Sequence, residues 1–470
     1  PTPRGEDAEK RSFVQATDRL QVWMGLTDEG KNYPSKVEAA GKVLALQQGS
    51  NVKADRISVE FQPAAKQEPR AEPVAPVPPE PKKKSLTTAS PEAAKITRSE
   101  TPDSSERDKN DPLAVLGGSV EPTALNASGD VSVTYKNPEK PDEPPMRVEA
   151  DMVEVNVPRG LAVLTGAPAK LWQGDNHIEG EVINFDRNAE AAKVTGAGQL
   201  RFYTDQDLSG NRLPESRPVR VDWKNWMLYH GQAGQCIFDG DVDLASAGEK
   251  MVCPRQMRLF FNPRKEATSA QKAEGVQRGA RSLSMGIDDF SGAQFTRIEA
   301  DGGRDEKLWV RMRTQKMHPG NSEWVLQRMQ IRGKQILYDD AKGFAYVNGP
   351  GDFLAEDYRK PEEKKLGSES KYANLMGGQI GRPSQTLFRW KTAMALNQNS
   401  RHVRLRDGVH MIHRSGNKML QLPGLKTQPL KHIKEGRLST LRAGVVDAWF
   451  GEPKPKIAVR DEHGRIKKPE

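Results

Sequence analysis

Cysteine, aromatic residues and long apolar runs are all scarce in this 470-residue chain. The two cysteines, Cys236 and Cys253, have no Cys-x-x-Cys spacing, which argues against a structural zinc site. They could form a disulfide in an oxidising compartment or remain as partly buried thiols. An apolar fraction of 35% with 6% aromatics is low for one large packed core. No stretch approaches the roughly 18 consecutive apolar residues that a membrane-spanning helix needs.

Motifs for catalysis are also missing. The chain has no Gly-x-Ser-x-Gly elbow, phosphate-binding loop or dinucleotide fingerprint in the right context. His410 and His413 are three residues apart and would face opposite sides of a strand, so they cannot share a metal ion. Asp241 and Asp243 alternate with apolar residues, which is typical of a solvated strand face rather than of a catalytic acid pair. We therefore expect no enzyme activity, no catalytic residue, no metal and no cofactor.

The charge balance is basic, with a formal net charge of +9. Such a balance favours anionic partners such as nucleic acid, phosphorylated lipid or a membrane surface. Trp309, Arg311 and Arg313 would share one strand face, where they could stack on sugars or bases. Core packing is the competing interpretation and the favoured one. Nucleic-acid binding requires a denser basic and aromatic stripe, so we expect no nucleic-acid partner.

Four apolar segments each begin at a glycine, run about eight residues and turn at a second glycine. They are Gly41–Gly49, Gly166–Gly174, Gly240–Gly248 and Gly408–Gly416. The first three continue into extended segments that end in phenylalanine. A strand–turn–strand unit cannot bury its apolar face alone, so it must stack on its neighbours and form a long molecule.

Two further correspondences support an internal repeat. Gly196-Ala-Gly198 and Gly349-Pro-Gly351 each follow a turn aspartate, and Trp223 and Trp390 each begin a Trp-Lys segment that precedes an Asp-Gly pair. Helical periodicity is scarce, with short candidates at 267–273 and 438–450. These patterns predict an all-β protein.

Composition divides the chain into β units and linkers. Proline, lysine and glutamate dominate the stretch after the first unit, which we expect to be disordered. The chain starts Pro-Thr-Pro-Arg-Gly, which suggests an internal fragment or a processed chain. The expected units are a first, incomplete β unit at 1–62, a disordered linker at 63–130, a β unit at 131–262, a linker at 263–280, a second full β unit at 281–425 and a basic tail at 426–470.

The segment Gly41–Phe61 resembles the lipopolysaccharide-transport bridge family, also called the OstA-like N-terminal domain. The similarity lies in the glycine-led strand Gly-Lys-Val-Leu-Ala-Leu and in the following Ala-Asp-Arg-Ile-Ser-Val-Glu-Phe. Residues 147–203 look like the same unit, and 221–261 and 388–420 look like diverged copies. Gly180 and Pro254 replace the alanine–aspartate step in later copies.

This resemblance implies an open β-jelly roll, the β-taco, whose units stack into an elongated array joined by disordered linkers. It implies a non-enzymatic periplasmic protein whose apolar groove shields the acyl chains of lipopolysaccharide, or a similar glycolipid, between the inner and outer membranes. It also implies docking to other envelope-transport components by edge-strand pairing, with self-association and a membrane tether beyond this chain as further options. The residues expected to line the groove are Ile57, Val59, Phe61, Val153, Val155, Ile183, Phe185, Val242, Leu244, Leu259, Val409 and Met411.

Three other interpretations stay open. A β-repeat scaffold could bind polysaccharide or protein without moving lipid, and the same apolar residues would then form an ordinary sandwich core. A carbohydrate-active enzyme on a jelly roll is a further class. The chain could also be the water-soluble portion of an outer-membrane barrel protein, to which this domain family is also fused. Its tail shows no lipid-facing strands, so any barrel would lie outside this sequence.

Overall fold

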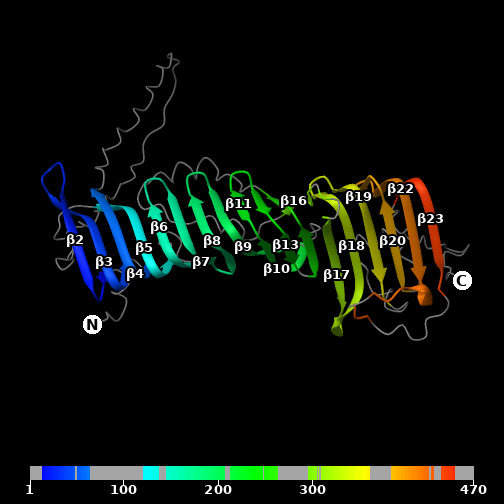
Figure 1. Cartoon of the computed structure of the whole chain (residues 1–470), viewed down its shortest axis with the longest axis horizontal. Coiled ribbons are helices and arrows are strands. Elements are labelled where there is room, and N and C mark those ends of the chain that lie inside the picture. The colour runs from blue at the N-terminus through cyan, green and yellow to red at the C-terminus, as the bar shows by residue number, and fades with distance from the viewer. Residues whose placement is uncertain are drawn as a thin grey trace, which may run out of the picture.

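The protein is an elongated, all-β array in which antiparallel strands follow one another along the long axis (Figure 1). The computed structural model describes residues 13–47, 50–63, 120–136, 144–206, 212–246, 248–262, 295–359 except 304, 306 and 307, 383–422, 425–427 and 436–449. Within these ranges 23 strands form one sheet and no α-helix is found.

The strands of the N-terminal half are β1 Phe13–Gln15, β2 Arg19–Leu26, β3 Asn32–Gln47, β4 Ser50–Pro63, β5 Val120–Tyr135, β6 Met146–Asn156, β7 Leu161–Gln173, β8 Asn176–Asp186, β9 Ala191–Gln206, β10 Arg212–Trp223, β11 Trp226–His230 and β12 Gln235–Asp239. Those of the C-terminal half are β13 Val242–Ser246, β14 Glu249–Cys253, β15 Gln256–Phe261, β16 Phe295–Asp301, β17 Val310–His318, β18 Asn321–Asp339, β19 Phe344–Asp357, β20 Ser384–Trp390, β21 Ala393–Asn397, β22 His402–Ser415 and β23 Leu438–Trp449. A short 3-10 helix, Gly416–Lys418, follows β22.

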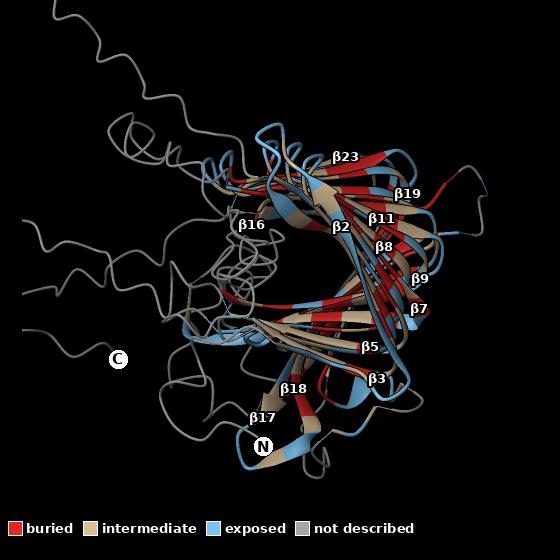
Figure 2. Ribbon diagram, turned by 90° about the vertical axis from the view of Figure 1, so that its left-hand side faces the viewer, coloured by how far each residue is buried: buried red, intermediate tan, exposed pale blue. Residues whose placement is uncertain are grey.

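The sheet bends along its whole length, so that each long strand contributes to two walls. Wall one contains β2, β11, β12, β15, β16 and β21, and wall two contains β1, β10, β13, β14, β17 and β20. The longer strands cross from one wall to the other, as β9 does by pairing with β11 through one half and β10 through the other. Seen along the long axis, the walls meet on one side and diverge on the other (Figure 2).

Glycines occupy many of the bends between the walls. Gly41 and Gly240 have φ of +83° and +82°, and each is followed by a residue that also has positive φ. Strand pairing shifts register at such points, for example between Ala40 and Val43. A left-handed glycine in mid-strand forms a bulge and turns the strand, because a side chain there would be strained.

The expectation that each of the four segments begins a strand at its first glycine is wrong. Gly41, Gly166 and Gly408 lie inside β3, β7 and β22 rather than at strand starts, and Gly240 lies at the bend between β12 and β13. The second glycines Gly174 and Gly248 do lie at turns, as predicted; Gly416 begins the 3-10 helix and Gly49 lies outside the described residues.

Two of the expected boundaries between β units and linkers or tail also differ from the structure. Strand β5 begins at Val120, inside the expected linker 63–130, and it pairs with β4 along its length. Strand β23 lies in the expected tail 426–470 and covers the helical candidate at 438–450. The small and polar residues of β5 and the exposed edge position of β23 both hide the alternation by which strands are recognised. Residues 64–119, the linker at 263–280 and the helical candidate at 267–273 lie outside the described residues.

Candidate functional site: the apolar interior between the walls

Two rows of directly opposed apolar side chains run along the inner face of the sheet, one on each wall. Residues that face each other across antiparallel strands point to the same side of the sheet, so each row is continuous. The row on wall one consists of Leu20, Ala39, Ile57, Ala127, Val153, Leu164, Ile183, Val194, Met227, Phe238, Met257, Ala300, Ile336, Val347, Met394, Leu405 and Val446.

The row on wall two is equally uninterrupted. It consists of Ala45, Val52, Val133, Val148, Leu171, Ile178, Leu200, Val221, Leu244, Met251, Met312, Ile331, Phe353, Phe388, Met411 and Leu441. With strands about 4.8 Å apart, each row extends for roughly 70 Å. Most members belong to one hydrophobic cluster that reaches from Ala39 to Val409.

The two ends of this interior are open to solvent. Leu20 and Val22 face inward from β2 because they pair with Ala39 and Val37, yet they are 52% and 47% exposed. Leu441 of β23 is 40% exposed in the same way at the other end. The apolar surface therefore continues to both ends of the described array without a polar cap.

At mid-length the two walls touch each other through phenylalanine rings. Phe202 of wall two lies with its ring centroid 6.0 Å from that of Phe261 and 5.8 Å from that of Phe295, both on wall one. All three rings are buried, and Phe261 and Phe295 are 5.3 Å apart. The expectation of a groove that is open along its whole length does not hold here, because aromatic packing joins the walls.

The residues expected to line the groove fall mostly in this interior. Eight belong to the buried cluster, and Val59 and Val155 pack against it. Phe61 and Met411 are half-buried and lie outside the cluster, although Met411 is a member of the wall-two row. The eight buried residues are Ile57, Val153, Ile183, Phe185, Val242, Leu244, Leu259 and Val409.

Sequence reasoning missed most of wall two. Of the expected residues only Val242, Leu244, Val409 and Met411 lie there. Each mid-strand bend adds a residue to the strand, which shifts the inward positions by one and interrupts the alternation. One local pattern could have indicated wall two: the apolar residues Leu171 and Ile178, which lie on either side of the Gly174 turn and pair with each other.

A buried polar network lies on the outer side of wall two, near the C-terminal end. The Glu356 carboxylate accepts hydrogen bonds from Tyr358 at 2.8 Å, from Gln385 at 3.0 Å and from Arg328. Its side chain is completely buried. Burial, together with the Glu356 charge, raises the pKa of Tyr358. Gln385 also bonds the backbone of Leu420 through both of its amide atoms, so the network fastens the segment after β22 to the sheet.

The two cysteines are separate buried thiols and form no disulfide. Burial raises the pKa of Cys253 to about 11 and raises that of Cys236 well above its usual value. The Cys253 thiol donates to backbone carbonyl oxygens, at 3.0 Å to Gln256. A search of the described residues finds no group of three or more His, Cys, Asp and Glu side chains placed to hold a metal ion.

Residues 28–191 match the family described as "LptA/(LptD N-terminal domain) LPS transport protein". The match covers strands β3 to β8 and the first residue of β9, and so includes the N-terminal portions of both apolar rows.

Among solved structures, the chain is similar to LptH from Pseudomonas aeruginosa, described as the LptA homologous periplasmic component of the conserved lipopolysaccharide transport device. The two are 17% identical, and the alignment covers 30% of this chain and 91% of LptH, with a TM-score of 0.21. A comparison with curated proteins gave no match. Among the described residues, no helix has the length and apolar character needed to cross a bilayer.

Proposed function

We propose that this protein is a non-enzymatic periplasmic component of lipopolysaccharide transport and envelope assembly, whose interior shields the acyl chains of lipopolysaccharide or a similar glycolipid. The observation that carries the proposal is the pair of uninterrupted apolar rows, in a chain whose residues 28–191 match an LPS-transport family. Transfer of each methylene from water to such a surface is worth about 0.8 kcal/mol, so a lipid chain would favour the interior.

Acyl chains would reach the interior most easily where the apolar rows are least covered. Leu20 and Val22 at one end and Leu441 at the other present inward-facing apolar side chains to solvent. Entry in the middle would require the rings of Phe202, Phe261 and Phe295 to separate first. The ends are therefore the proposed points of loading and release.

Site-specific photo-crosslinking in cells tests the proposal. A photoreactive residue at Phe185, which points into the interior, is expected to label lipopolysaccharide. The matched control is Asn184, the preceding residue of β8, whose side chain lies on the opposite face. Labelling at Phe185 without labelling at Asn184 supports lipid shielding. Equal labelling at both positions, or none at either, contradicts it.

The exposed ends also suit assembly with further β units by edge pairing. Strand β23 pairs only with β22, and β2 only with β3, among the described residues. A strand with one unpaired edge and an apolar inner face is a template for another strand. Leu441→Lys and Leu20→Lys should each weaken concentration-dependent association in light scattering. An unchanged mass distribution in both variants would contradict end-to-end docking.

A scaffold that binds polysaccharide or protein without moving lipid is the second candidate. The aromatic contact between the walls favours it, because Phe202, Phe261 and Phe295 close the interior as an ordinary sandwich core does. Mass spectrometry of lipids that co-purify with the full chain separates the two functions. Stoichiometric glycolipid is expected for transport, and its absence for the scaffold.

A further inference from the structure

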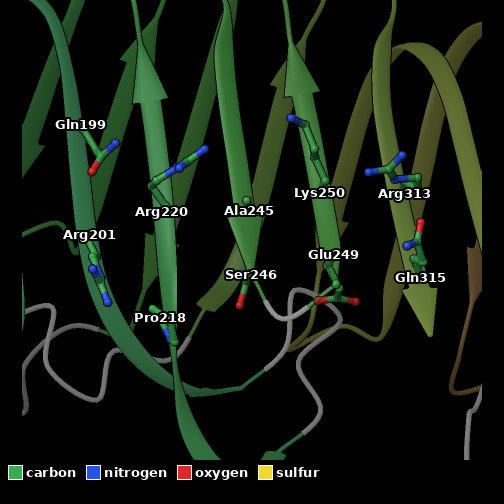
Figure 3. Close-up of a pocket in the computed structure, with 11 residues that line it drawn as sticks. Gln199, Arg201, Pro218, Arg220, Ala245, Ser246, Glu249, Lys250, Arg313 and Gln315 are labelled. Atoms are coloured by element: carbon green, nitrogen blue, oxygen red, sulfur yellow. The ribbon is translucent and has the colours of Figure 1, made fainter. Parts of the chain in front are cut away.

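The outer face of wall two carries a row of cations that the apolar interior does not explain. Cross-strand pairing places Arg201 opposite Arg220, Arg220 opposite Ala245, Ala245 opposite Lys250, and Lys250 opposite Arg313. The row therefore crosses five adjacent strands, and Figure 3 shows these side chains next to one another. They border a shallow pocket of about 560 Å³ that reaches the turn between β13 and β14.

In the absence of a ligand, the row places like charges next to one another. Like charges directly opposite one another destabilise a sheet, and the row contains two such pairs, Arg201 with Arg220 and Lys250 with Arg313. The small Ala245 between them leaves space above the sheet instead of a neutralising side chain. An anion placed in that space would relieve both repulsions.

The cations differ in whether the protein already neutralises them. Arg220 pairs with Asp222 at 2.9 Å, and Lys250 pairs with Asp243 at 2.5 Å. Arg201 donates to the Tyr203 hydroxyl, and neither Arg201 nor Arg313 forms an ion pair with any residue that the structure describes. The two ends of the row thus retain uncompensated charge.

At the end of β13 the pocket borders two residues whose side chains point away from the cation row. Ser246 follows Ala245 in β13 and lies opposite Val219, so its side chain is on the inner face of the sheet with that of Leu244. Glu249 pairs with Ser246 and alternates with Lys250, so its carboxylate, which accepts a hydrogen bond from the Thr314 hydroxyl at 3.4 Å, also lies on the inner face.

An aromatic surface continues the row on its other side. His177 lies opposite Arg201, and Trp172 lies opposite His177 with the two rings stacked at 5.0 Å. Arg147 then lies over the Trp172 ring, 5.6 Å from its centroid. Both faces of the indole are thus covered, so these rings offer their apolar edges to a sugar within about 10 Å of Arg201, while the cations suit the oxygens of a phosphate.

We propose that the pocket on the outer face of wall two binds the phosphate group of a phosphorylated sugar, held by Arg201, Arg220, Lys250 and Arg313, with the sugar ring beside Trp172 and His177. The phosphate site depends only on these residues. Its source as the head group of a glycolipid, rather than a free sugar phosphate, rests on the proposed function.

Calorimetric titration of the full chain tests the site with inorganic phosphate, glucosamine 1-phosphate, glucosamine and lipopolysaccharide before and after phosphatase treatment. Glucosamine 1-phosphate should bind more tightly than inorganic phosphate, and unphosphorylated glucosamine should not bind. Arg201→Gln and Arg313→Gln should each weaken phosphate binding about tenfold, because each removes a charge-assisted donor.

Lys193→Gln is the matched control, since Lys193 is an exposed cation of the same strand β9 on the outer face of wall one. Equal weakening by Lys193→Gln, or no saturable binding of any phosphorylated probe, overturns the site. Preference for lipopolysaccharide that still carries its phosphates assigns a glycolipid head group, and binding of glucosamine 1-phosphate alone assigns a free sugar phosphate. Phosphate binding without labelling at Phe185 would leave this site standing while the lipid-shielding proposal fails.

Discussion

The indole Nε1 of Trp223 donates a hydrogen bond of 3.1 Å to the carbonyl oxygen of Gly196. Trp390 makes the same bond, also 3.1 Å, to Gly349 in the C-terminal half. The two internal correspondences found in the sequence, Gly-x-Gly and Trp-Lys, therefore meet at one place in each half of the molecule. Each tryptophan closes a bend by covering the second glycine of the pair.

The close contact at these bends predicts intolerance of any side chain. A Cβ at Gly198 would lie 2.5 Å from the Trp223 ring and 2.3 Å from the Glu179 carbonyl oxygen. Gly198→Ala should therefore lower the free energy of unfolding by about 2–3 kcal/mol, through forced displacement of packed atoms. Gly444→Ala is the control, because a Cβ there meets nothing within 4 Å. Denaturant unfolding measures both, and equal stability of the two variants would refute the bend mechanism.

Loss of the buried Glu356 carboxylate should be strongly destabilising. Its removal leaves Arg328, Tyr358 and Gln385 without their shared acceptor, and a buried charge pair that loses one member costs about 3–5 kcal/mol. We expect this loss for Glu356→Ala in chemical unfolding. Glu323→Ala removes an exposed carboxylate paired with Lys426 and should have little effect. A similar loss in both variants would contradict a special role for the buried network.

Both thiols should be unreactive in the folded protein. The thiolate is the reactive species, and burial raises the pKa of Cys253 to about 11 and that of Cys236 well above its normal value. A thiol-specific chromogenic reagent at pH 8 should therefore detect no free thiol until denaturant is added, and two afterwards. Rapid labelling of the native chain would show that the strands around these residues open readily.

Acidification should destabilise the protein through His177 and His413. Burial lowers the pKa of both, and for His177 the nearby Lys170 and Arg201 add to this effect while Glu179 opposes it. The unfolded chain then binds more protons than the folded one below about pH 6.5, so stability is lost as the pH falls through the folded pKa values. His177→Gln with His413→Gln should flatten the melting temperature between pH 7.5 and 5.5. An unchanged slope would exclude these residues as its source.

Much of the fold follows from local patterns in the sequence. The alternation of Ile57, Val59 and Phe61 and that of Val153 and Val155 predict strands, and β4 and β6 confirm them. All-β architecture and stacking into a long array also follow from the repeated units. The same alternation identifies the expected groove residues on wall one.

The rest depends on contacts that a short stretch of sequence does not contain. A glycine such as Gly41 looks like a strand boundary, although neighbouring strands on both sides keep β3 continuous through the bend. The contact of Phe202 with Phe261 and Phe295 joins residues about 60 to 90 positions apart, and no local pattern signals it. The cation row on wall two is likewise visible only once the register of five strands is known.

Because every strand pair bends in the same way, the length of the array can change by whole hairpins. A hairpin such as β7 and β8 contributes one residue to each apolar row per strand and leaves the chain running in its original direction. Removal of residues 161–186 would let β6 meet β9 with both rows still aligned, and would shorten the array by about 10 Å. Each added hairpin therefore lengthens the array by the same amount. A duplication within the gene can lengthen the protein while the two walls and their bend stay the same.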